Sequence, residues 1–207
     1  MIDAIKNCLI AESQTLKKLS EQINDGVVPF LERISSCKGK RCFTGVGKSL
    51  MVARKIASSF SCVGYASIDV DPLRLLHGDL GFLDQNDLLI AVSNSGETEV
   101  LISALTNAKH LGIDIISITG NKNSTVANMS SHHILVKTDE AGAFGLVPSS
   151  SATAVMALGD ALLCGLIKRD NLSILDFQRH HPEGSLGRIM KEPCCDSNAN
   201  NVSCNDK

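Results

Sequence analysis

A short apolar run at residues 87–92 leads directly into the polar sequence S-N-S-G-E-T, and a segment with helical spacing follows. The chain therefore places a buried strand, a hydroxyl-rich turn and a helix N-terminus in immediate succession. Ser93, Ser95 and Thr98 supply hydroxyls, the helix supplies free N–H groups, and the helix dipole favours negative charge. This combination suits a phosphate group. An ordinary strand-to-helix loop with a good N-cap contains the same residue types, so this stretch alone leaves both interpretations open.

The same alternation of strand and helix recurs along most of the chain. We expect apolar strands at residues 41–44, 64–70, 87–93, 114–119 and 133–136. We expect helices at residues 50–61, 98–111, 124–129, 152–168 and 172–177. Strands that are apolar on both faces indicate a sheet covered by helices on both sides. The pattern predicts an α/β fold with a parallel, five-stranded, doubly wound sheet flanked by helices, in which ligands bind at the carboxyl ends of the strands.

Two further segments flank this alternating region. Residues 2–34 carry apolar positions at helical spacing, and the pattern breaks near Gly26 and Pro29, which predicts two helices. These helices precede the first strand, so they cover the sheet or a neighbouring subunit. The C-terminal end is rich in Asn and Ser, and we expect it to be disordered. We assign residues 1–190 to one domain with N-terminal helices, and residues 191–207 to a polar tail.

The composition excludes several classes of function. The 207 residues carry a net charge of -2, and Trp is absent. We therefore expect no basic surface for nucleic acid and no aromatic platform for stacking bases. There is no basic leader with a long apolar core, and no apolar run approaches the roughly 18 residues that span a bilayer. The eight scattered cysteines suit free thiols in a reducing compartment, so we expect a cytoplasmic protein. We also expect no membrane partner, no metal and no other cofactor.

A second glycine-containing turn, G-V-G-K-S at residues 45–49, follows the first strand. It fails as a nucleotide P-loop, because that motif requires a glycine where Cys42 stands. It also fails as a dinucleotide-binding turn, which requires a glycine where Leu50 stands. What remains is a strand-to-helix turn whose Lys48 can neutralise a phosphate or a negatively charged intermediate. A solvated surface lysine is the alternative.

Further polar turns carry groups that can transfer protons or bind a sugar. His77 lies in H-G-D-L-G, Glu140 follows the fifth expected strand, and His181 lies in H-P-E-G-S-L-G. Ser149 and Ser150 open the long helix, where one hydroxyl serves as a cap and the others can line a sugar pocket. Histidine can move protons near neutral pH. Taken singly, however, a loop histidine or a surface carboxylate is more often inert.

Together these motifs resemble a known family. S-N-S-G-E-T resembles the phosphate loop of SIS (sugar isomerase) domains. G-V-G-K-S, H-G-D-L-G, the segment E-A-G-A-F-G-L-V-P-S-S-S and H-P-E-G-S-L-G resemble D-arabinose-5-phosphate isomerases in particular, in the same order and with similar spacings. The phosphate loop specifies only the domain, whereas the two histidine motifs narrow the match to the isomerase. The resemblance implies the SIS fold, a flavodoxin-like three-layer α/β/α arrangement.

The resemblance also implies an activity, the interconversion of D-arabinose 5-phosphate and D-ribulose 5-phosphate through a cis-enediol, for octulosonate in lipopolysaccharide or capsule synthesis. Carried over position by position, it implies these catalytic residues: Lys48, His77, Glu140 and His181. It implies a second set that binds the substrate and its phosphate: Gly47, Ser49, Ser93, Asn94, Ser95, Thr98, Ser149 and Ser150. Glu140 is either the base or the group that orients a histidine. Relatives commonly form dimers or tetramers, so we expect a homo-oligomer.

The chain departs from the family pattern in three respects. Val100 stands where members often carry a Glu, with Glu99 beside it, and H-P-E-G replaces the commoner H-P-G-G. Many members continue into a pair of CBS domains, so we expect a single-domain form without that regulatory part. Two alternatives stay open, a non-catalytic sugar-phosphate-binding SIS regulator and an SIS isomerase for a six- or seven-carbon phosphosugar.

Overall fold

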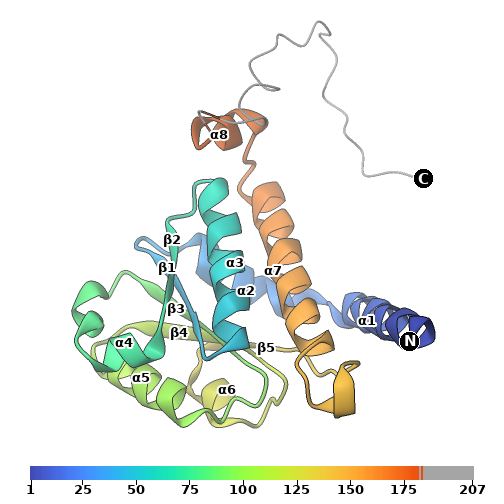
Figure 1. Ribbon diagram of the computed structural model, residues 1–207. Helices are drawn as coiled ribbons and strands as arrows, with labels where there is room; N and C mark the ends of the chain where they lie inside the picture. The colour runs from blue at the N-terminus through green and yellow to red at the C-terminus, as the bar shows by residue number, and fades with distance from the viewer. Residues whose placement is uncertain (182, 184–207) are drawn as a thin grey trace, which may run out of the picture.

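Five parallel strands form one sheet at the centre of the computed structural model, which describes residues 1–181 and 183 (Figure 1). The strands are β1 (Arg41–Gly45), β2 (Ser67–Val70), β3 (Leu88–Ser93), β4 (Asp114–Thr119) and β5 (His132–Leu135). The predicted parallel, five-stranded sheet is confirmed. β2 is shorter than expected, because Gly64 adopts a φ of 95° in the preceding turn and pairing with β1 starts only at Ser67.

The strands lie in the order β2-β1-β3-β4-β5, so the chain moves to one side of β1 first and to the other side afterwards. In a doubly wound sheet, ligands bind in the crevice outside such a switch point. The register aligns Gly45 of β1 with Val92 of β3, and Ser93 of β3 with Thr119 of β4. The turns that follow these three strands therefore begin together at the carboxyl edge of the sheet.

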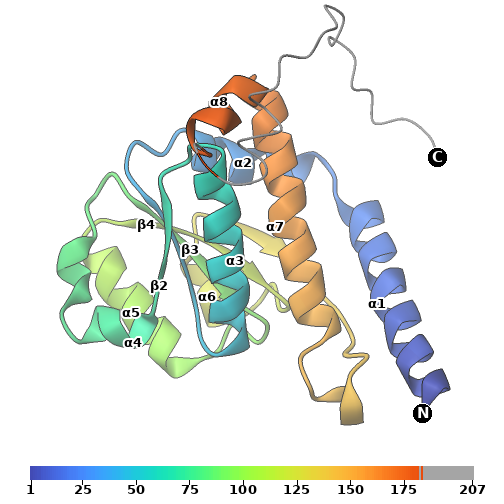
Figure 2. The same ribbon diagram turned by 45° about the horizontal axis from the view of Figure 1, so that its top comes forward.

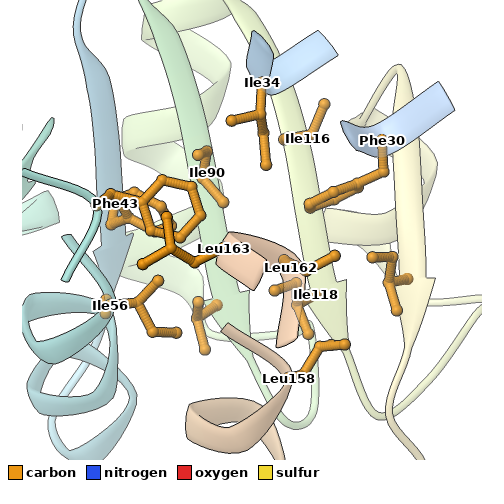
Figure 3. Close-up of a cluster of buried hydrophobic side chains, with 14 of the residues drawn as sticks. Phe30, Ile34, Phe43, Ile56, Ile90, Ile116, Ile118, Leu158, Leu162 and Leu163 are labelled. Carbon is orange, nitrogen blue, oxygen red and sulfur yellow. The ribbon is translucent and has the colours of Figure 1, made fainter. Parts of the chain in front are cut away.

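The larger hydrophobic core fills one face of the sheet. The helices on this face are α2 (Val28–Ser35), α3 (Lys48–Cys62) and α7 (Ser150–Arg169). Figure 3 shows Phe43 and Ile90 of the strands facing Ile56 of α3 and Leu162 of α7. The two helices approach closely at Gly159, where an added Cβ would lie 2.5 Å from Cγ1 of Ile56. This packing holds α3, which begins directly after β1, against α7.

A smaller core fills the other face. The helices here are α4 (Pro72–Leu76), α5 (Glu99–His110) and α6 (Thr125–Met129), which Figure 1 shows on the opposite side of the sheet from α3 and α7. Leu101 and Leu105 of α5 pack with Val126 of α6 on Leu89 and Ala91 of β3. In the part of the chain that the structure describes, three short 3-10 helices lie in the connections, η1 (Asp25–Val27), η2 (Asp79–Phe82) and η3 (Ala143–Gly145). Helices thus cover both faces, as expected.

Helix α1 (Ile2–Gln22) stands apart from the sheet and packs along α7. Figures 1 and 2 show its N-terminal half projecting away from the body of the domain. Leu19 is its one buried residue, and the large apolar side chains that it leaves exposed are Ile2, Ile5, Leu9 and Ile10, with the exposed Met1 just before them. The two predicted N-terminal helices are confirmed as α1 and α2, with η1 between them.

Within the described residues, α7 is long and apolar enough to cross a membrane by length and composition. Its apolar side chains have another partner, however, because Leu158, Leu162 and Leu166 are buried in the larger core. The composition of α7 is therefore that of a core helix. A short helix, α8 (Ile174–Arg179), follows it. The polar tail that we predict to be disordered, residues 191–207, lies outside the described residues.

Candidate functional site

A cavity of about 190 Å³ opens at the carboxyl edge of the sheet, outside the ends of β1, β3 and β4. Both apolar and polar side chains line it. The polar side chains that line it are Lys48, Ser49, Ser93, Asn94, Thr119 and Ser151. Ligand pockets for drug-sized molecules usually measure roughly 300–1,000 Å³, so this cavity suits a smaller polar ligand. It lies at the switch point of the sheet, where the fold predicts a ligand.

The loop at residues 93–98 forms one wall. Oγ of Ser93 accepts a hydrogen bond from the N–H of Gly96 at 3.0 Å, and Oγ of Ser95 accepts one from the N–H of Glu97 at 3.2 Å. Thr98 is the N-cap of α5 and makes no side-chain capping bond. Its hydroxyl and the first-turn N–H groups of α5 are therefore available to an anion. Ser93 and Asn94 line the cavity itself, whereas Ser95 and Thr98 are not among its lining residues.

The turn after β1 forms the facing wall. Gly47 adopts a φ of 60° as the N-cap of α3, which a side chain would strain, and Lys48 and Ser49 begin the helix. Lys48 and Ser49 line the cavity. Lys48 is exposed and has no ion-pair partner among the described residues. An uncommitted ammonium group at the same cavity as Ser93 and Asn94 is well placed to meet a negative charge on a ligand.

Glu140 reaches from the end of the sheet to the N-terminus of α7. One of its oxygens accepts hydrogen bonds from the N–H of Ser149 at 2.8 Å and the N–H of Ser151 at 3.3 Å, and the other accepts the hydroxyl of Ser151. Burial raises the pKa of Glu140, but the hydrogen bonds from Ser151 and Ser149 outweigh burial and hold the pKa below its ordinary value. Among the described residues, no hydrogen bond joins Glu140 to a histidine.

The serines at the start of α7 divide their roles in a way that the sequence did not reveal. Oγ of Ser149 accepts the N–H of Gly142 at 2.8 Å, and Oγ of the buried Ser150 accepts the N–H of Ala141 at 3.2 Å. Both therefore hold the backbone beside Glu140, and neither lines the cavity. Ser151, which was not among the predicted residues, does line it.

The two predicted histidines lie away from the cavity in the single chain. His77 is the exposed C-cap of α4, on the face of the sheet opposite α3 and α7. His181 follows α8, stacks on Phe177 with ring centroids 3.9 Å apart, and its Nδ1 lies 2.9 Å from the carbonyl oxygen of Phe177.

The position of α8 explains the separation of His181 from Lys48. His180 packs beside Gly64, which follows the end of α3, whereas Lys48 begins that helix. The 15 residues of α3 span ~22 Å. Figures 1 and 2 accordingly show α8 at the far end of α3 and α7. Most of H-P-E-G-S-L-G after His181 lies outside the described residues.

Metal chemistry has no candidate site in the part of the chain that the structure describes, where no group of three or more His, Cys, Asp or Glu could hold an ion. The predicted site also left out Thr119, which ends β4 and lines the cavity beside Ser93. The rule that strand ends carry the ligand would have found it.

Comparison with known proteins agrees with this geometry. The SIS domain family matches residues 34–164, which hold all five strands and both walls of the cavity. The chain belongs to the SIS domain family. The match confirms the family resemblance that S-N-S-G-E-T indicated, and the SIS fold with it.

Two curated relatives show what this SIS chain is similar to. It is 39% identical over 186 residues to arabinose 5-phosphate isomerase KdsD of Escherichia coli strain K12, covering 89% of this chain and 57% of the relative. It is 38% identical over 192 residues to arabinose 5-phosphate isomerase KpsF of Escherichia coli O6:H1, covering 92% of this chain and 59% of the relative. The chain thus spans 57–59% of the length of these relatives.

This chain aligns with nearly the whole length of one solved structure. The structure of an E. coli CFT073 protein in complex with arabinose 5-phosphate aligns with a TM-score of 0.84 at 33% identity, over 87% of this chain and 97% of that one. The resemblance to arabinose-5-phosphate isomerases that the motifs indicated is therefore confirmed as a resemblance.

Proposed function

We propose that the chain interconverts arabinose 5-phosphate and ribulose 5-phosphate. The observation that carries this proposal is the cavity at the switch point, where Lys48 and Ser49 face Ser93 and Asn94 across a space suited to a small phosphosugar. The similarity to KdsD, KpsF and the arabinose 5-phosphate complex supports this substrate over others. The product would serve octulosonate synthesis for lipopolysaccharide or capsule. The unpaired cysteines of the described region fit a cytoplasmic reaction.

The reaction moves a proton between C1 and C2 of the open-chain sugar through a cis-enediol. In the proposed arrangement the phosphate rests on the loop at residues 93–98 and the N-terminus of α5, and this remote contact positions the reacting carbons. Gly47 and Ser49 shape the facing wall. Lys48 stabilises the negative charge that develops on the oxygen of the intermediate. In this arrangement the phosphate contacts position the substrate, and the wall that holds Lys48 carries out the chemistry.

For Glu140 we propose a positioning role. Its carboxylate accepts hydrogen bonds from the N–H groups and hydroxyls of Ser149 and Ser151. Its lowered pKa keeps it ionised near neutral pH. An efficient general base has a pKa near the working pH, which Glu140 lacks in this setting. By accepting hydrogen bonds from Ser149 and Ser151 it orders the start of α7, and thereby sets Ser151 at the cavity.

For proton transfer we propose His77 and His181, contributed by other copies of the chain. Within one chain His181 lies at the opposite end of α3 from Lys48, so it reaches a cavity only in an oligomer. The exposed apolar side chains of α1 provide a surface for such an assembly. A dimer or a tetramer built on this surface would complete each site with residues of a neighbour.

A coupled assay for ribulose 5-phosphate tests the function. The purified chain is given arabinose 5-phosphate and a panel of five-, six- and seven-carbon phosphosugars, and turnover is expected to be highest with arabinose 5-phosphate. Lys48→Ala should lower turnover by about 10²-fold or more, as loss of a charge-stabilising group does. Lys38→Ala is the matched control, an exposed lysine before β1 at the amino edge of the sheet.

The outcome separates the open alternatives. Binding of phosphosugars without any turnover would indicate a regulator in place of an enzyme. Highest turnover with a six- or seven-carbon phosphosugar would indicate a neighbouring SIS isomerase. Either result would overturn the assignment.

A further inference from the structure

The side chain of Glu97, the glutamate of S-N-S-G-E-T, reaches toward α6 and does not line the cavity. Its Oε1 accepts the N–H of Thr125 at 2.9 Å, and its Oε2 accepts the hydroxyl of Thr125 at 2.8 Å. The residue before it makes a third link, because the carbonyl oxygen of Gly96 accepts the N–H of Val126 at 3.1 Å. Two consecutive residues of the phosphate loop, Gly96 and Glu97, are therefore bonded to the first two residues of α6, Val126 and Thr125.

The contact between the two segments is also close in space. Gly96 adopts a φ of 69°, and an added Cβ would lie 2.1 Å from Oγ of the buried Ser124. Further back in the loop, the carbonyl oxygen of Asn94 accepts the N–H of Gly120 at 2.9 Å. The connection from β4 to α6 thus supports the whole loop, and Glu97 provides the side-chain link between them.

A carboxylate beside a phosphate site needs a physical reason, because it repels the anion that the loop is to bind. Glu97 is not among the residues that line the cavity. The backbone and side-chain hydrogen bonds from Thr125 lower the pKa of Glu97, so it is ionised at neutral pH. Both oxygens are directed to Thr125, the first residue of α6, whose N–H and hydroxyl stabilise the negative charge by hydrogen bonding.

We propose that Glu97 is a positioning residue for the phosphate site, and that the Glu97–Thr125 pair holds the loop in the shape that receives the phosphate. The proposal rests on the proposed function, in which this loop binds the phosphate of the sugar. Loss of the pair leaves the reacting groups on the facing wall in place. It loosens the loop, so the free protein must order the loop when the phosphate binds, and affinity falls. Loss of the Glu97–Thr125 pair should therefore raise KM and leave kcat nearly unchanged.

Three variants separate position from charge. Glu97→Ala removes both bonds to Thr125, and we expect KM to rise about tenfold with kcat within about twofold, the pattern of lost uniform binding. Glu97→Gln keeps an oxygen for the N–H of Thr125 and an amide that can donate to its hydroxyl, so KM should stay within about threefold of wild type. Thr125→Val removes the hydroxyl alone and should lie between them.

A double-mutant cycle and a control complete the design. Because the two side chains act as one unit, Glu97→Ala with Thr125→Val should bind no worse than Glu97→Ala alone. Asp84→Ala is the matched control. Asp84 is also exposed and accepts two hydrogen bonds from one residue, Asn86, but lies before β3 at the opposite end of that strand. Its loss should leave KM unchanged.

A second readout keeps the proposal separate from the proposed function. Inorganic phosphate should raise the melting temperature of the wild type, and should raise that of Glu97→Ala much less. If the wild type binds phosphate in this way but isomerises no phosphosugar, the proposed function fails and the positioning role stands.

An unchanged KM and an unchanged phosphate response in Glu97→Ala would overturn the positioning role, as would a wild type that binds no phosphate. A steep fall of kcat in Glu97→Gln would also overturn it, because the charge itself would then be in use. If Glu97→Ala does not fold, as judged by circular dichroism, Thr125→Val carries the same test.

Discussion

Replacing Glu140 by alanine removes the acceptor that orders the start of α7. Its carboxylate accepts the N–H groups and the hydroxyls of both Ser149 and Ser151. A hydrogen bond to a charged group contributes ~1.5–3 kcal/mol, and loss of a helix cap costs ~0.5–2 kcal/mol. Glu140 is only partly buried, so water replaces some of these bonds. We expect Glu140→Ala to lower the free energy of unfolding by about 2–3 kcal/mol, or the melting temperature by about 4–12 °C.

The pH dependence of this effect has a definite sign. The folded-state pKa of Glu140 is lowered, so its contribution to stability is present above the ordinary value of 4.5 and is lost as the pH falls through the folded-state pKa. The difference in melting temperature between wild type and Glu140→Ala should therefore be full near neutral pH and should narrow as the pH falls below the ordinary value of 4.5. Asp139→Ala removes the neighbouring exposed carboxylate and is the matched control throughout this pH range.

Kinetics of Glu140→Gln complete the test. The amide keeps an oxygen for the N–H groups of α7, so we expect the acidic limb of the pH–rate profile to stay where it is in the wild type. A loss of about 10²–10⁴-fold in kcat together with a shifted acidic limb would show that the carboxylate is the base. A melting temperature of Glu140→Ala equal to that of wild type would also refute the positioning role.

Three other outcomes follow from the geometry. Gly96→Ala should cost about 2 kcal/mol or more and weaken phosphate binding, because its φ of 69° and its contact with Ser124 leave no room for a Cβ; a wild-type melting curve would contradict this. Mixing inactive Lys48→Ala with inactive His181→Ala under conditions of subunit exchange should restore part of the activity, measured against each variant alone, and no recovery in a proven mixed oligomer would exclude shared sites. Turnover should be unchanged by EDTA, and a loss that added divalent metal reverses would contradict a metal-free reaction.

The architecture could be predicted because each strand is a short apolar run that ends in a polar turn. Burial on both faces requires such runs, and the strands at residues 87–93 and 114–119 were expected almost residue for residue. The error at β2 has a local cause. Tyr65 is apolar enough to extend the pattern, but it follows Gly64 out of a turn in which its N–H bonds to the carbonyl oxygen of Phe60, so it is not paired with β1.

The candidate site was harder to predict, because contact across loops depends on register and on helix rotation. Ser149, Ser150 and Ser151 look alike in sequence, yet rotation about α7 sends only the third to the cavity. Glu97 and Thr125 are 28 positions apart, and their pairing follows from the adjacency of β3 and β4. His181 illustrates the remaining difficulty, since its motif matches the family while its place in one chain lies far from Lys48.

The central claim is that this SIS domain transfers a proton between C1 and C2 of arabinose 5-phosphate. Proton NMR of that substrate with the purified chain in D₂O tests it most directly. The account predicts that signals of ribulose 5-phosphate appear, with deuterium entering the product at the carbon that receives the proton, and that Lys48→Ala slows this by about 10²-fold or more. An unchanged substrate spectrum at high enzyme concentration, with folded protein, would contradict it.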